Sequence, residues 1–279
     1  MANILLLDDS DVAGRAMQGI LARGNHTCFV ATKPDEAWRI MREGVVFDLV
    51  FCELKLGGSA TTSFLQRLRE DWFWKILPAV VYTYETDAKL VRKALGLRVQ
   101  NYLIKPYNDE LIFAEIAKAT KNPWRNLHFE EPRSFCALTG LSADTLTLMR
   151  RDVMTGYDRA VQTFPGWAER RQNEEVFAQI AALATAAESA GIWAGVDFLR
   201  ELQEQAAVGN WSTFRTCAEP LEFASRLIFC QLNPSYAPDC MRTEEQRVEA
   251  REAAERARWE RTDVTVSGPL LDPAALLKQ

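Results

Sequence analysis

The stretch Asp48-Leu-Val-Phe-Cys-Glu53-Leu-Lys-Leu decides how the first part of this chain folds, because a short apolar run in it ends at a carboxylate. Four further apolar runs each precede an amphipathic helical stretch: Ile4 to Leu7, Cys28 to Ala31, Ala79 to Tyr82 and Tyr102 to Ile104. Continuous apolar strands that alternate with helices are typical of a parallel sheet covered on both faces. We therefore predict a doubly wound α/β domain with five parallel strands over residues 1–121.

Polar side chains follow four of these strands, at the point where each strand ends. They are three carboxylates, a hydroxyl and an ammonium group, belonging to Asp8, Asp9, Glu53, Thr83 and Lys105. Because the carboxyl ends of parallel strands meet at one edge of a sheet, we expect these side chains to converge on one pocket. Carboxylate oxygens are ligands for Mg²⁺, so a divalent ion could bind Asp8, Asp9 and Glu53. The sequence requires no other cofactor.

The same residues resemble the response-regulator receiver domain (CheY-like) of bacterial two-component signalling. The family pattern is an acidic pair, an acceptor aspartate, a hydroxyl residue and an aromatic residue three positions before Lys-Pro. Here it reads Asp8-Asp9, Glu53, Thr83 and Tyr102-Leu-Ile-Lys105-Pro106. The resemblance implies a flavodoxin-like receiver over residues 1–121, with Glu53 at the phosphoacceptor position and Thr83, Tyr102 and Lys105 as switch residues. A core or edge role for Tyr102 remains the alternative.

The acceptor position departs from the family, because residue 53 is glutamate and not aspartate. One extra methylene moves the carboxylate by about a bond length, and in-line attack on a phosphodonor is sensitive to such a displacement. Glu53 could instead pair with Lys105 or Thr83 and imitate the activated state, or merely neutralise Lys105 in an inert pocket. Gly57, where the family often has proline, is expected to loosen the following loop, and Tyr84 to crowd the pocket mouth.

The second half of the chain is helical in pattern and shows no strand. Residues 122–140 are too apolar for a free linker, and we expect them to pack on one or both domains. Residues 141–235 predict an antiparallel bundle of four amphipathic helices. We expect a break at Phe164-Pro-Gly-Trp167 and a kink at Pro220, because proline lacks an amide donor and clashes with the preceding helical turn.

The bundle also resembles a histidine-phosphotransfer domain, through Leu183, Ala187, Gly191, Leu202 and Gly209. At the position of the phosphorylated histidine stands Ala181, which has no nucleophile. The only histidines of the chain, His26 and His128, lie outside this segment. The resemblance thus implies a domain that has lost its phosphohistidine, and a generic bundle used for docking or dimerisation is the alternative.

Residues 236–279 predict a charged helix followed by an extended tail. The chain has a net charge of -5, and residues 123–240 carry this acidity, so a nucleic-acid partner is not expected. No apolar stretch is long enough to cross a membrane, and the N-terminus lacks the features of a signal peptide. We therefore expect a cytoplasmic protein with reduced cysteines. The two distant histidines also argue against a zinc site.

Three functions remain open at this stage. The first is an atypical response regulator that acts by phosphorylation-independent protein–protein interaction and is not an enzyme. Its partner would be a signalling kinase, a regulator or an adaptor, and a homodimer is compatible with it. The second is a phosphorelay component that is phosphorylated at the receiver pocket in a Mg²⁺-dependent way. The third is a phosphatase of partner proteins with its active site in the bundle, although no Glu and His pairs there suit metal or acid–base chemistry.

Overall fold

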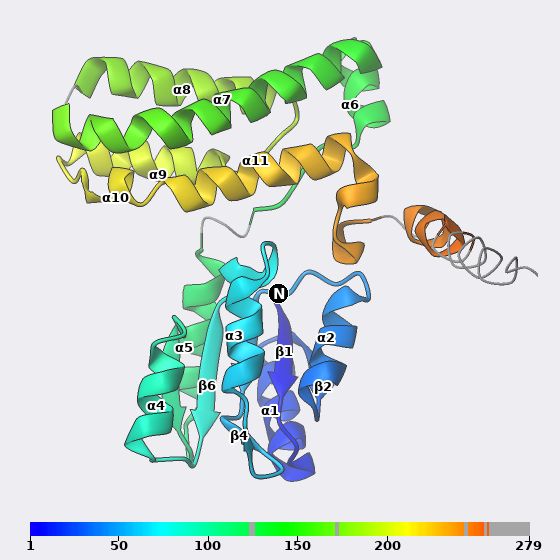
Figure 1. The fold of residues 1–279 in the computed structure, drawn as a ribbon, viewed down its shortest axis with the longest axis vertical. Coiled ribbons are helices and arrows are strands. Elements are labelled where there is room, and N and C mark those ends of the chain that lie inside the picture. Colours follow the sequence, from blue (N-terminus) through cyan, green and yellow to red (C-terminus); the bar gives the residue numbers. More distant parts are fainter. Residues whose placement is uncertain (123–125, 171–172, 243–244, 254–255, 257–279) are drawn as a thin grey trace, which may run out of the picture.

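The computed structural model describes residues 1–122, 126–170, 173–242, 245–253 and 256. The predicted sheet consists of strands β1 (Asn3–Leu7), β2 (Thr27–Ala31), β3 (Leu49–Cys52), β6 (Ala79–Thr83) and β7 (Asn101–Ile104). Neighbouring strands are parallel, in the order β2-β1-β3-β6-β7 (Figure 1). This is the strand order of the flavodoxin-like doubly wound fold, so the predicted fold class is confirmed.

Helices cover both faces of the sheet because alternate strand residues point to opposite sides. The helices are α1 (Asp11–Arg23), α2 (Pro34–Arg42), α3 (Thr62–Glu70), α4 (Ala88–Leu95) and α5 (Asp109–Thr120). On one face Leu6 and Phe51 belong to a core that includes Met17 of α1 and Ile112 of α5. On the other face the core continues into α2, α3 and α4. The two cores hold the sheet rigid between them, which fixes the ends of the strands.

The loop after β3 forms a small antiparallel hairpin of β4 (Lys55–Leu56) and β5 (Ser59–Ala60). Its two central residues, Gly57 and Gly58, have φ angles of 53° and 82°. A two-residue hairpin turn of type I′ needs positive φ at both positions, and a proline could not adopt it. The expectation of a loosened loop at Gly57 is therefore wrong: glycine makes this turn tight.

The second half of the chain is helical, as predicted. It contains α6 (Pro132–Thr139), α7 (Ala143–Arg170), α8 (Asn173–Ser189), α9 (Val196–Ala207), α10 (Ser212–Arg215) and α11 (Ala218–Leu232), followed by the single turns η3 (Pro234–Tyr236) and η4 (Asp239–Met241). The long helices form a bundle in which α7 contacts α8 and α11, and α8 contacts α9 (Figure 1). The predicted tail beyond residue 256 lies outside the described residues.

The structure corrects two details of the predicted bundle and shows a helix in the segment that precedes it. Pro165 lies inside α7, so the predicted break is wrong; the helix continues because Phe164 and Trp167 are buried and stack with ring centroids 4.2 Å apart. Pro220 does not kink a helix, because α11 begins at Ala218 and the proline falls in its first turn. The backbone N–H groups of a first turn have no partner within the helix, so no hydrogen bond is lost there. The segment 122–140 contains α6, whose start is capped by the Glu131 carboxylate.

The bundle sits on the edge of the sheet where the strands begin, and the strands point away from it (Figure 1). Phe223 of α11 packs against Trp72 and Phe73, just before the helical turn η1 (Trp74–Ile76). Glu219 lies 3.4 Å from Lys75 and 3.5 Å from Arg98. The carboxyl edge of the sheet, where the site residues were expected, is left uncovered by the bundle.

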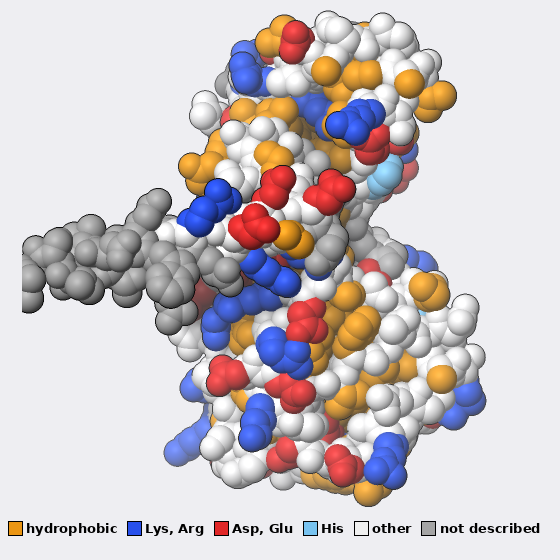
Figure 2. Space-filling view, turned by 90° about the vertical axis from the view of Figure 1, so that its right-hand side faces the viewer, with side chains coloured by type: hydrophobic (Ala, Val, Ile, Leu, Met, Phe, Trp, Pro, Cys, Tyr) orange, Lys and Arg blue, Asp and Glu red, His pale blue; other side chains and the backbone are white. Residues whose placement is uncertain are grey.

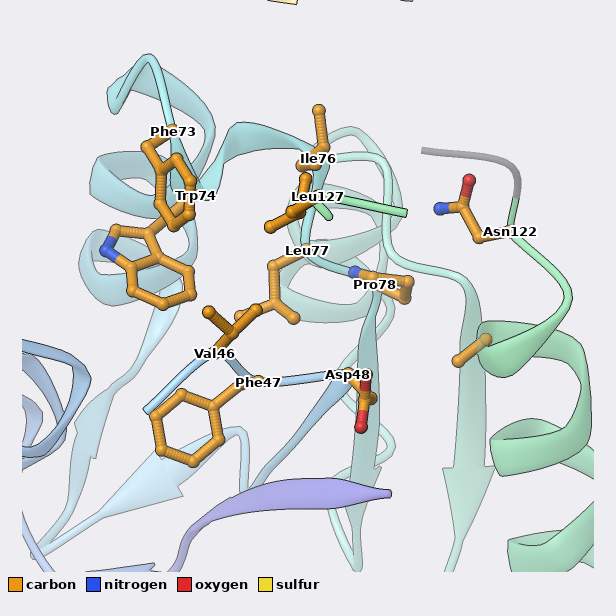
Figure 3. Close-up of a pocket in the computed structure, with 11 residues that line it drawn as sticks. Val46, Phe47, Asp48, Phe73, Trp74, Ile76, Leu77, Pro78, Asn122 and Leu127 are labelled. Atoms are coloured by element: carbon orange, nitrogen blue, oxygen red, sulfur yellow. The ribbon is translucent and has the colours of Figure 1, made fainter. Parts of the chain in front are cut away.

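An apolar cavity of about 30 Å³ lies at this junction (Figure 3). Val46, Phe47 and Leu77 of the receiver and Leu127 of the linker lie around it in Figure 3. Such a volume holds little more than one water molecule, and the lining offers few polar partners. The linker therefore packs on the receiver at this point, as its apolar sequence predicted.

Candidate functional site

Four of the predicted site residues meet at the carboxyl edge of the sheet, and all four are buried. Asp8 follows β1, Glu53 follows β3, Thr83 ends β6 and Lys105 follows β7. The Lys105 ammonium lies 2.8 Å from Glu53 Oε2 and 3.0 Å from Asp8 Oδ2. Two buried carboxylates thus share one buried cation, which partly offsets the cost of removing these charges from water.

The Glu53 carboxylate is hydrogen-bonded on both oxygens. Oε1 accepts bonds from the Thr83 hydroxyl and from the backbone amide of Leu54, the latter at 2.7 Å. Oε2 accepts from Lys105 at 2.8 Å. The sequence suggested that Glu53 could pair with Lys105 or Thr83, and in the structure it is bonded to both.

The Asp8 carboxylate is also fully engaged, and one of its partners was missed by the sequence analysis. Oδ1 accepts from the Ser10 amide at 2.8 Å, while Oδ2 accepts from both Lys105 and the Tyr82 hydroxyl. Burial raises the pKa of Tyr82, and the bond to Asp8 raises it further, so the phenol stays a proton donor. The Lys105 ammonium lies 4.2 Å from the centroid of the Tyr82 ring, which adds a cation–π contact.

Lys105 is charged in this pocket. Burial acts to lower its pKa, but the hydrogen bonds and charges of Glu53 and Asp8 outweigh burial and raise the pKa above its ordinary value. An ammonium group held between two carboxylates is the strongest electrostatic feature of the pocket. It draws Asp8 and Glu53 together without any further ion.

Asp9 does not join the other four side chains. It is exposed, and its Oδ2 accepts from the amide of Gly57 at 2.6 Å, at the tip of the β4–β5 hairpin. Within the described residues, no three His, Cys, Asp or Glu side chains are placed to hold a metal ion. The set Asp8, Asp9 and Glu53 therefore does not fit Mg²⁺ as it stands, because Lys105 and Tyr82 take the oxygen of Asp8 that a cation would need.

The pocket is connected to the start of α4 through Glu85. The amide of Glu85 donates to Thr83 Oγ1 at 3.1 Å, and its carbonyl accepts from the half-buried Tyr102 hydroxyl at 2.5 Å. The Glu85 carboxylate pairs with Lys55 of the hairpin, and this hydrogen bond lowers the pKa of Glu85. Thr83 and Tyr102, two predicted switch residues, are thus joined by one intervening residue.

Two other residues singled out from the sequence lie outside the pocket. Tyr84 is 73% exposed, and the centroid of its ring is 5.5 Å from the Lys105 ammonium, so it stands at the pocket mouth without closing it. Ala181 is half-buried and belongs to α8, a helix on the side of the bundle away from the receiver (Figure 1).

Comparison with known protein families gives a match in the first part of the chain. Residues 4–117 match the response regulator receiver domain family, so this part of the chain is a receiver domain. A receiver domain implies a role in two-component signalling, and receivers interact with proteins such as kinases and regulators. In the described part of the chain, no helix is both long and apolar enough to span a membrane.

Individual relatives match only part of the chain. The 3′,5′-cyclic-nucleotide phosphodiesterase regA of Dictyostelium discoideum is 22% identical over 136 residues, which are 48% of this chain and 17% of that protein. A two-component response regulator of Clostridium difficile is 23% identical and covers 44% of this chain and 98% of its own, with a TM-score of 0.40. Chemotaxis protein CheY4 of Vibrio cholerae is 20% identical over 43% of this chain and 98% of its own, also at 0.40.

Proposed function

We propose that this chain is an atypical response regulator that binds a protein partner without being phosphorylated. The observation that supports this most directly is the position of the Glu53 carboxylate, which is bonded at once to Thr83 and to Lys105. The family resemblance makes these two side chains switch residues. Here a carboxylate of the chain itself already engages both of them, so the receiver is held in an activated-like arrangement.

The same contacts argue against phosphoryl transfer to Glu53. A nucleophilic oxygen must be free to approach phosphorus in line, yet each oxygen of Glu53 is tied to a donor. Mg²⁺ would have to displace Lys105 or Tyr82 from Asp8 before it could bind. We therefore propose that the pocket works without Mg²⁺ and that its role is structural.

The output surface in this proposal is the face formed by α4, the edge strand β7 and α5. Thr83 and Tyr102 lead from the pocket to this face through Glu85. Three large apolar side chains are exposed there, Leu95, Ile104 and Leu111. The bundle does not cover them: they stay exposed, while the bundle sits on the edge of the sheet where the strands begin (Figure 1). Exposed apolar side chains next to a switch fit a protein partner, a second copy included.

The bundle, in this proposal, is a docking or dimerisation module and not a relay or an enzyme. Ala181 offers no nucleophile, and the two histidines of the chain lie outside α8. The chain spans 17% of the phosphodiesterase that it resembles, so the similarity does not carry that activity over. A partner phosphatase, with its active site in the bundle, has no support from the described side chains.

Intact mass spectrometry tests the absence of phosphorylation. The wild type, Glu53→Asp and Glu53→Gln are incubated with acetyl phosphate and Mg²⁺ and then weighed. Glu110→Gln, which changes an exposed carboxylate on α5, is the matched control. We expect no added phosphoryl group on the wild type or on the control. A phosphoryl adduct on the wild type that is absent in Glu53→Gln would contradict the proposal and favour a phosphorelay component.

A further inference from the structure

A groove of about 770 Å³ lies on the side of the receiver where α2 and α3 meet η4 and the helical segment 245–253. Three carboxylates and six arginines line it, and the arginines are Arg39, Arg42, Arg67, Arg242, Arg247 and Arg251. Figure 2 looks onto this side and shows Lys and Arg side chains gathered at the waist between the receiver and the bundle. The groove is remote from the pocket of Glu53, because it does not involve the carboxyl ends of the strands.

Three of these arginines have no ion-pair partner among the described residues. Arg39 pairs with Glu43, and Arg242 lies 2.9 Å from Asp239. The other carboxylate of the groove, that of Asp35, is exposed. Arg42, Arg67 and Arg251 make no ion pair with a residue that the structure describes. Guanidinium groups around one hollow repel each other unless an anion joins them.

Two buried donors lie in the wall of the groove. Trp38 is only 5% exposed, and its indole Nε1–H has no hydrogen-bond partner in the described part of the chain. The buried Nε–H of Arg242 likewise has none. A buried donor without an acceptor costs about 1–3 kcal/mol. Both groups can only donate, so a ligand that reaches them after a shift of their side chains has to supply acceptor oxygens.

The Trp38 indole also positions one of these arginines. The Arg67 guanidinium lies 4.4 Å from the centroid of the Trp38 ring, so the indole holds the side chain that faces the groove. Arg247 donates to the Glu43 carbonyl at 3.1 Å, which ties the helical segment 245–253 to the end of α2. The groove is therefore built from two parts of the chain that lie about two hundred positions apart in sequence.

We propose that this groove binds a small phosphorylated ligand, with Arg42, Arg67 and Arg251 holding its phosphate oxygens. Guanidinium groups match phosphate geometry and form paired hydrogen bonds with it. The volume lies in the range of small-molecule sites, and a nucleotide is the kind of ligand that fills it. The ligand would join α2 and α3 to the segment 245–253, so its binding would secure the C-terminal helix on the receiver.

Isothermal titration calorimetry on the full chain tests this proposal, with ATP and inorganic pyrophosphate as probes at fixed ionic strength. The variants are Arg42→Ala, Arg67→Ala and Trp38→Phe, and the matched control is Arg15→Ala, an exposed arginine on α1. We expect saturable binding of at least one probe below about 1 mM. Each arginine variant should weaken it by about tenfold or more, because a charge-assisted bond is lost, and Trp38→Phe should weaken it less. The control should leave it unchanged.

Three results would overturn the proposal. The first is that neither probe binds the wild type. The second is binding that Arg15→Ala weakens as much as Arg67→Ala, which would indicate general charge attraction. The third is a hexaglutamate peptide that binds more tightly than both probes, which would assign the groove to an acidic protein segment. Arg42 and Arg67 are exposed, so their loss does not threaten folding.

Discussion

At the scale of single residues, one methylene group separates Glu53 from the aspartate of the receiver family. That methylene carries the carboxylate onto Lys105 and Thr83 together. The sequence indicated both partners because each stands at a strand end. It gave no sign of Tyr82, which lies inside the apolar run of β6, on the same face of the sheet as Leu6, and donates to Asp8 from there. Polar residues at the strand ends could be expected to meet, whereas Tyr82 looked like one more apolar residue of the sheet.

Removing the shared cation should be the most damaging change in the pocket. Lys105→Met leaves the Asp8 and Glu53 carboxylates buried without a countercharge, which costs about 3–5 kcal/mol of unfolding free energy. Urea unfolding followed by circular dichroism measures it, with Lys118→Met, an exposed lysine on α5, as the control. If the unfolding free energy falls by less than about 1 kcal/mol, the two ion pairs of Lys105 contribute little to stability.

The stabilisation by Lys105 should fade at alkaline pH. Its pKa is raised in the folded protein, so the folded state holds this proton more tightly than the unfolded state. The contribution is complete below the ordinary lysine pKa of about 10.4 and is lost as the pH rises through the higher folded value. The difference in unfolding free energy between wild type and Lys105→Met should thus narrow from pH 8 to pH 11. A difference that stays constant or widens would contradict the charged state of Lys105.

At the scale of elements, the order and type of the receiver strands and helices followed from the sequence, because each strand is a continuous apolar run. The hairpin β4–β5 did not, since two-residue strands carry too few residues for a pattern. The predicted break at Phe164-Pro-Gly-Trp167 failed for another reason. The tendency of proline to break a helix is outweighed there by the burial of two aromatic rings. This stabilisation exists only in the packed bundle, so the local sequence does not reveal it.

Pro165 should therefore lower the stability of α7 even though the helix passes through it. Replacing it by alanine restores one helical hydrogen bond and removes the clash with the preceding turn, which should raise the unfolding free energy by about 1–3 kcal/mol. Chemical unfolding of the full chain measures the change. A decrease instead would show that the ring of the half-buried proline packs in a way that alanine cannot replace.

At the scale of the whole molecule, the bundle docks where the strands begin and leaves the pocket, the α4–β7–α5 face and the arginine groove accessible. Phe223→Ala removes the aromatic contact with Trp72 and Phe73 and should cost about 3–5 kcal/mol. We expect the receiver and the bundle then to unfold in separate steps in a calorimetric scan. Phe229→Ala, a partly exposed position on the same helix, is the control and should keep the wild-type profile. A single unchanged transition in Phe223→Ala would show that this contact does not couple the domains.

The central claim is that the Glu53 carboxylate holds Thr83, and through Glu85 also Tyr102, in place without a phosphoryl group. Hydrogen–deuterium exchange over residues 83–104 tests it most directly, in the wild type, Glu53→Gln and the control Glu110→Gln, each with and without acetyl phosphate and Mg²⁺. The prediction is faster exchange from Thr83 to Tyr102 in Glu53→Gln only, and no effect of the phosphodonor on the wild type. Equal exchange in Glu53→Gln and wild type, or a wild type that becomes protected when the phosphodonor is added, would contradict it.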